Sequence, residues 1–185
     1  MSIKLTTQQI DAAIPKVAKG LSRYLWLQAR VAGLEAFYND AQFRRRFNHF
    51  YRVRRSATWR EAFYGLMGRA LRQQLQFHTV LDLLREATNR YEASFASKLF
   101  ATLNPSAPLI DSVVLKNLGL RLPSAWCPDR AAQICMLHQK MARLYAAFLK
   151  TANGRHLVAE FKRAYPAALI TKEKMLDLVL WQTRV

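Results

Sequence analysis

Apolar residues recur every three or four positions along nearly the whole chain, which is the spacing of one face of an α-helix. One such stripe comprises Phe43, Phe47, Phe50 and Tyr51, and a second begins at Trp59. We find no convincing run of alternating apolar and polar residues of the kind that marks a strand. The pattern therefore predicts an all-α fold, a compact multi-helix domain without a sheet.

Caps and turn residues divide this pattern into separate helices. A Thr-x-x-Gln capping box at Thr6 opens the first helix, and a Thr-x-x-Glu box at Thr58 opens the helix that carries Trp59. Pro15 is expected to kink or divide the N-terminal region, and the pair Asn153-Gly154 to end the longest helix. The later helices are predicted over residues 94–103, 127–151, 156–165 and 171–181, and the segment 112–118 is predicted as a short helix or an extended turn.

With 185 residues, of which 51% are hydrophobic, the chain is long enough for a folded domain and too apolar for bulk disorder. We expect a single all-helical domain over 1–185, either compact or as two small lobes that share a core, with the cleft near 90–125. No apolar run is long enough to span a membrane, and the N-terminus lacks the apolar core of a signal peptide. Cys127 and Cys135 make no disulfide framework. A cytoplasmic monomer is therefore expected.

Net charge narrows the choice of partner. The chain has 29 Lys and Arg against 12 Asp and Glu, a formal net charge of +17 at pH 7. Such an excess favours DNA or RNA as partner, although an anionic membrane surface or a ribosome would also attract it. No acid lies between Gln42 and Trp59 to balance the arginines there. The candidate phosphate contacts of this region are Arg44, Arg45, Arg46, Arg52, Arg54, Arg55 and Arg60.

A second candidate binding region is the predicted helix start near Ser94. Small side chains there would let a phosphate approach the backbone amides of the first turn, with Lys98 one turn further in. The same small residues would equally suit a tight helix–helix contact with Lys98 in solvent. Ser94, Ser97 and the later Lys116 are taken as candidate nucleic-acid contacts.

Asp111 is the most informative single residue. Acidic groups are scarce in this chain, and this one stands where the apolar pair Leu109-Ile110 meets the start of a new helix. With Ser112 next, Asp111 is a good N-cap. The same carboxylate at the mouth of an apolar pocket would stabilise positive charge that develops on a sugar, or would orient a water. Both interpretations stay open from the residues alone.

The surrounding motif resembles that of a known superfamily. The matching residues are Pro108, Asp111, Ser112, Val114 and Lys116, followed by Leu118-Gly119-Leu120. This order is similar to the Pro-x-x-Asp-[Ser/Thr]-x-Val-x-[Arg/Lys] segment of the helix-hairpin-helix DNA glycosylases. The resemblance covers about residues 90–122. It implies an all-helical fold, DNA as partner and Asp111 as the catalytic carboxylate.

The resemblance also bears on Lys98. In bifunctional members of the superfamily a lysine of the hairpin attacks the sugar, and Lys98 is the only lysine in the corresponding helix. The chain departs from the superfamily in three respects. Residues 92–97 replace the Gly-rich hairpin turn, Lys98 is closer to Asp111 than the superfamily's lysine is to its aspartate, and the cysteines of an iron-sulfur site are missing. The short spacing favours hydrolysis over attack by the lysine.

These observations predict a DNA glycosylase-like hydrolase that flips a modified or damaged base out of duplex DNA and excises it, in repair or in defence against phage. Its base pocket is expected to include Trp59, Phe95, Trp126 and Trp181. No cofactor is expected, because no Walker motif or dinucleotide loop occurs. No metal is expected, because Cys127, Cys135 and His138 lack a fourth ligand. The alternatives are a non-catalytic nucleic-acid-binding protein, with Asp111 only a cap, and a helical interaction module.

Overall fold

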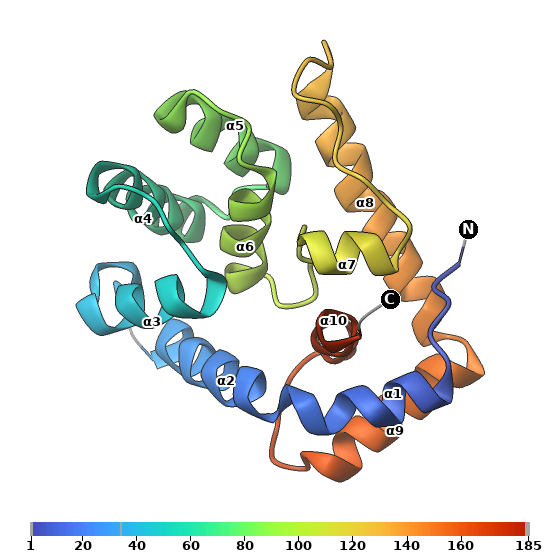
Figure 1. Ribbon diagram of the computed structural model, residues 1–185. Helices are drawn as coiled ribbons and strands as arrows, with labels where there is room; N and C mark the ends of the chain where they lie inside the picture. Colours follow the sequence, from blue (N-terminus) through green and yellow to red (C-terminus); the bar gives the residue numbers. More distant parts are fainter. Residues whose placement is uncertain (1, 34, 184–185) are drawn as a thin grey trace.

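The computed structural model describes residues 2–33 and 35–183 (Figure 1). This part of the chain contains ten α-helices, two short 3-10 helices and no strand, so the all-α prediction is confirmed. The elements are α1 (Thr7–Ala13), η1 (Ile14–Val17), α2 (Ala18–Gly33), η2 (Phe37–Asn39), α3 (Ala41–Tyr51), α4 (Ala57–Gln73), α5 (Phe77–Thr88), α6 (Ala93–Leu103), α7 (Ser112–Asn117), α8 (Arg130–Leu149), α9 (Ala152–Ala164) and α10 (Lys172–Gln182).

Side-chain caps set many of the helix starts. The N-cap residues whose side chains accept a backbone N–H are Thr6, Asp40, Ser56, Asp111, Thr151 and Thr171. The capping box expected at Thr58 is wrong. The backbone of Ser56 is extended and its hydroxyl accepts the Trp59 N–H at 3.2 Å, so α4 begins before Thr58. A serine two residues upstream is the better cap because it lies where the chain is still extended.

The turn between α8 and α9 corrects a second expectation. Gly154 does not end the long helix but lies in the first turn of α9, where its N–H donates to the Thr151 hydroxyl at 3.1 Å. A β-carbon at this position would collide with the carbonyl oxygen of Phe148. Glycine is therefore needed here for the close approach of two helix ends rather than for helix termination.

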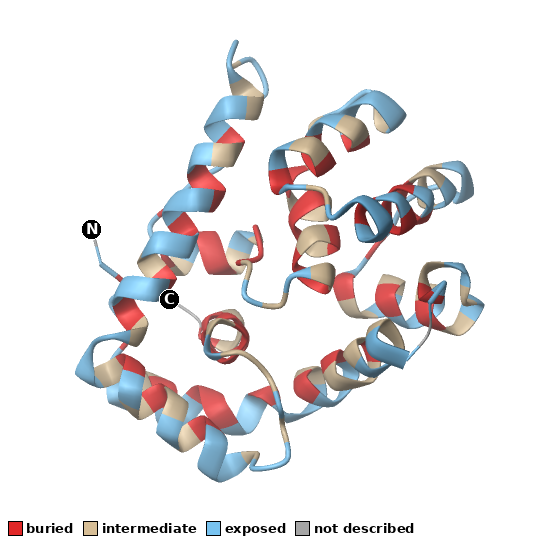
Figure 2. Ribbon diagram, turned by 180° about the vertical axis from the view of Figure 1, so that it is seen from behind, coloured by how far each residue is buried: buried red, intermediate tan, exposed pale blue. Residues whose placement is uncertain are grey.

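Helix α10 lies at the centre of the molecule, surrounded by α1, α7, α8 and α9 (Figure 1). All residues from Lys174 to Leu180 are buried, on every side of this helix. In the outer helices the buried residues lie mainly on the inward sides (Figure 2). A helix that is buried all round is a core element. The two charged residues within it, Lys174 and Asp177, therefore need partners inside the protein.

Helices α3 to α6 lie together to one side of α10, and α2 connects them to the N-terminal helix α1 (Figure 1). One connected hydrophobic cluster contains buried residues from every helix of the described chain. The end of α3, the middle of α6, the start of α7 and the stretch of α10 from Lys174 to Trp181 converge on one cavity. This convergence places the candidate site.

Candidate functional site

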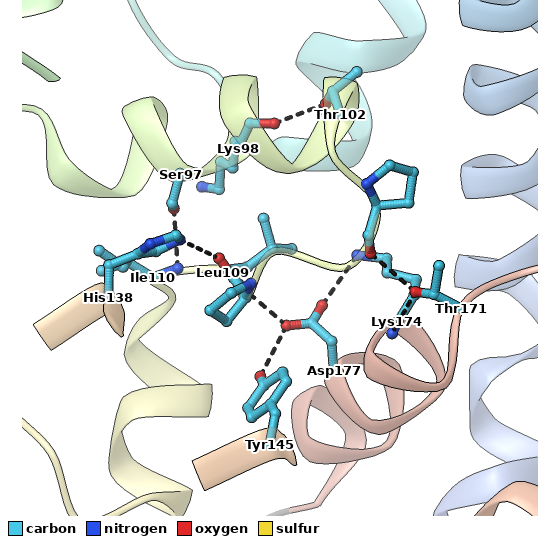
Figure 3. A network of polar contacts seen from close by, with 12 residues as sticks. Ser97, Lys98, Thr102, Leu109, Ile110, His138, Tyr145, Thr171, Lys174 and Asp177 are labelled. Atoms are coloured by element: carbon cyan, nitrogen blue, oxygen red, sulfur yellow. Dashed lines mark hydrogen bonds and ion pairs between the residues drawn. The ribbon is translucent and has the colours of Figure 1, made fainter. Parts of the chain in front are cut away.

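The segment between α6 and α7 carries Asp111, and side chains of other elements fix it (Figure 3). Its backbone has no helical hydrogen bonds of its own, so its buried polar groups need other partners. Ser97 of α6 accepts the Ile110 N–H at 2.9 Å, and Asp177 of α10 accepts the Leu109 N–H at 3.4 Å. The two residues that precede Asp111 are thus tied to two different helices.

Two further hydrogen bonds hold the proline-containing part of the same segment (Figure 3). The Thr171 hydroxyl donates to the Pro105 carbonyl at 3.0 Å, and Nε2 of His138 lies 3.2 Å from the Pro108 carbonyl. Since a carbonyl only accepts, the His138 imidazole carries its hydrogen on Nε2. Burial lowers the pKa of His138 from 6.5 to about 4, so this imidazole is neutral at pH 7.

Asp111 is the N-cap of α7. Its Oδ1 accepts the Val113 N–H at 2.9 Å, and the side chain is half-buried. The N-cap interpretation is therefore confirmed. Capping and a chemical role do not exclude each other, because the bond to Val113 also fixes the direction in which the carboxylate points.

Asp111 and Lys98 line one cavity of about 270 Å³, hereafter the Lys98–Asp111 cavity. Phe50, Tyr51 and Trp181 give it an aromatic wall. The volume lies just below the lower end of typical small-ligand sites, roughly 300 Å³. A cavity of this volume suits a small ligand rather than a larger cofactor.

Lys98 reaches the cavity from α6. Its Nζ lies 3.3 Å from the carbonyl oxygen of Tyr51 and 5.0 Å from the centre of the Phe95 ring. Burial lowers the pKa of the Lys98 ammonium, Asp111 opposes this effect and Arg52 adds to it. A lowered pKa raises the fraction of neutral, nucleophilic amine near pH 7.

A buried ion pair forms another part of the cavity lining. Lys174 and Asp177 of α10 are only 4% and 5% exposed, and Lys174 Nζ lies 3.0 Å from Asp177 Oδ2. The other carboxylate oxygen of Asp177 accepts from the Tyr145 hydroxyl at 3.1 Å as well as from Leu109. These donors compensate the loss of hydration of the buried Asp177 carboxylate, so the ion pair is a fixed polar part of the cavity wall.

Of the aromatic residues expected in a base pocket, only Trp181 lines this cavity. Trp59 stacks on Phe63 at 5.1 Å between ring centres and packs edge-on against Phe95, so both belong to an aromatic cluster outside the cavity lining. Trp126 is 92% exposed in the loop before α8. The cavity instead uses Phe50 and Tyr51, which belong to the apolar stripe that begins at Phe43.

The arginine-rich region divides into paired and outward-facing side chains. Arg44 makes two hydrogen bonds to Glu61, at 2.7 and 2.9 Å, and Arg55 pairs with Glu92 at 3.0 Å. The stretch between Gln42 and Trp59 contains no acid, so these two ion pairs could not be predicted from it. Both acidic partners lie outside that stretch. The other arginines line surface hollows: Arg45 and Arg60 join Arg44 in one, Arg45 and Arg46 lie in another, and Arg52 and Arg54 lie in a third.

One expected phosphate contact is corrected by the structure. Ser97 is fully buried and its hydroxyl donates to the Ser94 carbonyl at 2.9 Å while it accepts from Ile110, so it cannot meet a phosphate. Ser94 and Lys116 line an open hollow that also includes Lys98 and Asp111. These two residues thus border the candidate site.

Comparison with protein-family models, with curated proteins and with solved structures gives no match to this chain. None of the helices in the described part of the chain is long and apolar enough to cross a bilayer.

Proposed function

We propose that this protein is a DNA glycosylase-like enzyme that flips a modified or damaged base and cleaves its N-glycosidic bond, in repair or in defence against phage. One observation carries the proposal: Lys98 and Asp111, from separate elements, line a single cavity of nucleobase size. Two hollows that share lining residues with that cavity carry several cationic side chains, which supports a polyanionic substrate. The motif around Asp111 supports DNA in particular.

In this proposal the flipped base enters the Lys98–Asp111 cavity against the aromatic wall. As the bond between C1′ and the base nitrogen breaks, its electron pair leaves with the base and positive charge develops on the sugar. The Asp111 carboxylate stabilises that charge. Its direction is already fixed by the cap, so little reorganisation is needed during the reaction.

The nucleophile that adds to C1′ is either water or Lys98. The short sequence spacing between Lys98 and Asp111 favoured water, yet the fold brings both side chains to one cavity. Its lowered pKa suits the Lys98 amine for attack. We therefore propose that neutral Nζ bonds to C1′ and that one of its protons passes to the departing base. The C1′–O4′ bond then breaks and the remaining Nζ proton passes to O4′, which opens the ring and leaves an imine between Nζ and C1′. Elimination of the 3′ phosphate and hydrolysis of the imine would complete the cycle.

An abasic-site assay tests the proposal. Wild-type protein and its Asp111→Asn variant would be incubated with DNA that carries uracil, alkylated bases, oxidised bases, hydroxymethylcytosine or glucosylated cytosines. We expect base release by the wild type and its loss in the variant. Asparagine is as good an N-cap as aspartate, so thermal stability should be retained and the loss would reflect chemistry.

A non-catalytic nucleic-acid-binding protein is the second candidate, and the confirmed capping role of Asp111 favours it. Under that alternative no substrate of the panel loses a base, while DNA binding is tight, salt-sensitive and equal in the two proteins. That result would overturn the enzymatic proposal.

A further inference from the structure

A strongly basic hollow of about 480 Å³ adjoins the Lys98–Asp111 cavity. We call it the basic hollow, and its cationic lining consists of Lys16, Lys19, Arg23, Arg52 and Arg54, with His49 beside them. These side chains come from η1, from α2, from α3 and from the segment after α3. No stretch of sequence joins them, so only the fold reveals the cluster.

The charge of the basic hollow has no acidic partner among the residues that the structure describes. None of its described lining residues is acidic, and none of the ion pairs found among the described residues involves one of these cations. Like charges gathered in a hollow repel one another, and a bound anion would relieve this repulsion. The basic hollow is therefore suited to an anionic group.

Its position relative to the candidate site identifies the kind of anion. Phe50, Arg52 and Trp181 line both the basic hollow and the Lys98–Asp111 cavity, so the two share a wall. In a nucleic-acid strand each base is attached to a sugar that lies between two phosphodiesters. A base in the cavity would place one of its flanking phosphates toward an adjoining surface.

Arg52 in the shared wall has an unusual backbone. It is the C-cap of α3 and adopts the left-handed conformation, with φ 54° and ψ 46°. Glycine and asparagine are the residues that adopt this conformation at least cost. Arg52 instead carries a guanidinium whose central carbon lies 5.9 Å from the centre of the Trp181 ring. Gln74 ends α4 in the same conformation, which supplies a matched control.

We infer that the basic hollow binds a phosphodiester flanking the nucleotide in the Lys98–Asp111 cavity, with Arg52 between the phosphate and the base. The inference rests on the proposed function, because the phosphodiester belongs to the strand whose nucleotide occupies that cavity. It adds a phosphate subsite formed by the N-terminal helices. An anionic membrane surface is the rival source of phosphate.

Binding measurements on the purified full chain test this subsite. The probe is a fluorescent duplex with one tetrahydrofuran abasic-site analogue, titrated by anisotropy between about 50 and 200 mM salt. Lys19→Gln/Arg23→Gln should reduce the slope of log affinity against log salt by about one, since the subsite holds one phosphate and each phosphate contact contributes roughly 0.9. Lys140→Gln/Arg143→Gln, with the same charge change on the exposed face of α8, should leave the slope unchanged.

Arg52→Gly gives the sharper variant because glycine suits the left-handed backbone and should not lower the melting temperature. We expect the salt slope to fall by about one. Gln74→Gly, with the same backbone change, should bind DNA like wild type. Replacing single phosphates beside the analogue with neutral methylphosphonates should weaken wild-type binding at one flanking linkage, and Arg52→Gly should no longer respond at that linkage.

The outcomes separate this inference from the proposed function. Wild-type binding and base release by both Arg52→Gly and Lys19→Gln/Arg23→Gln would overturn the subsite and leave the enzyme intact. Loss of DNA affinity in these variants, with no base release by any protein, would support the subsite and overturn the enzyme. Absent DNA binding by wild type would overturn both. Anionic phosphatidylserine vesicles that bind wild type but not the variants, while DNA binding stays unchanged, would assign the hollow to a membrane instead.

Discussion

The Ser97 hydroxyl accepts the backbone N–H of Ile110 at 2.9 Å, and this bond joins the residue before Lys98 to the residue before Asp111. The two candidate catalytic side chains are therefore coupled through their backbone neighbours as well as through the cavity they line. Ser97 is fully buried and Ile110 is 1% exposed, so water cannot replace the bond. This hydroxyl is therefore one of the anchors that set the relative position of Lys98 and Asp111.

Ser97→Ala should destabilise the fold and impair the site together. The Ile110 N–H would stay buried without an acceptor, which costs about 1–3 kcal/mol in the free energy of unfolding. Base release should fall more than binding of the abasic-site duplex, because the segment that carries Asp111 loses one anchor. Urea denaturation and single-turnover assays measure the two effects. Ser106→Ala, an exposed hydroxyl of the same segment, should change neither.

The pH dependence of stability should report His138. Burial lowers the pKa of His138 to about 4 in the folded protein, while the unfolded chain has the ordinary value of 6.5. The unfolded state therefore binds a proton more readily between these values. Stability is complete above pH 6.5 and is lost as the pH falls toward 4, by about 3 kcal/mol from this group.

Urea titrations at pH steps from 7.5 to about 4 measure that loss. His138→Gln is the matched variant, because its amide still donates to the Pro108 carbonyl but does not titrate. Its unfolding free energy should fall less steeply with acid than that of wild type. Parallel curves for the two proteins would show that His138 contributes nothing to the acid sensitivity.

The fold could be predicted from the sequence because helix starts and apolar stripes are local signals. The predicted helix at 94–103 corresponds to α6, and the segment 112–118, predicted as a short helix or an extended turn, forms α7. Local signals mislead where two compete, as at Thr58, where Ser56 lies two residues earlier in extended backbone. Gly154 misleads for another reason. Glycine is required there because a β-carbon would collide with Phe148 of the preceding helix, and not because of the backbone conformation of Gly154 itself.

The site could be predicted only in part from the sequence, because a cavity is formed by residues that are distant along the chain. Lys98 and Asp111 could be singled out as a lone lysine and a scarce acid. Phe50 and Tyr51 could not be told from core, because they continue the apolar stripe of Phe43 and Phe47. The ion pair of α10 shows no local pattern that distinguishes it from a solvated i, i+3 pair.

The Lys174–Asp177 pair should respond differently to single and double substitution. Lys174→Met leaves the buried Asp177 carboxylate without its cation, and removal of one partner of a buried pair costs about 3–5 kcal/mol. Lys174→Met/Asp177→Asn removes both charges and keeps an acceptor for Leu109, so it should be more stable than Lys174→Met alone. A urea double-mutant cycle measures the coupling. Glu160→Gln, which breaks the surface pair with Arg163, should cost less than about 1 kcal/mol.

Lys98 should form a covalent bond with DNA if its amine is the nucleophile. Incubation of wild type with its substrate in the presence of borohydride should reduce the imine and give a protein–DNA adduct of retarded mobility. Lys98→Met keeps the aliphatic part that packs near Phe95 but has no amine, so it should give no adduct. Asp111→Asn should give little adduct because base loss precedes imine formation.

A preformed abasic site bypasses that step, so on such DNA Asp111→Asn should recover part of its trapping whereas Lys98→Met should not. Base release by wild type without any adduct, and with strand breaks only after alkali, would instead assign the nucleophile to water.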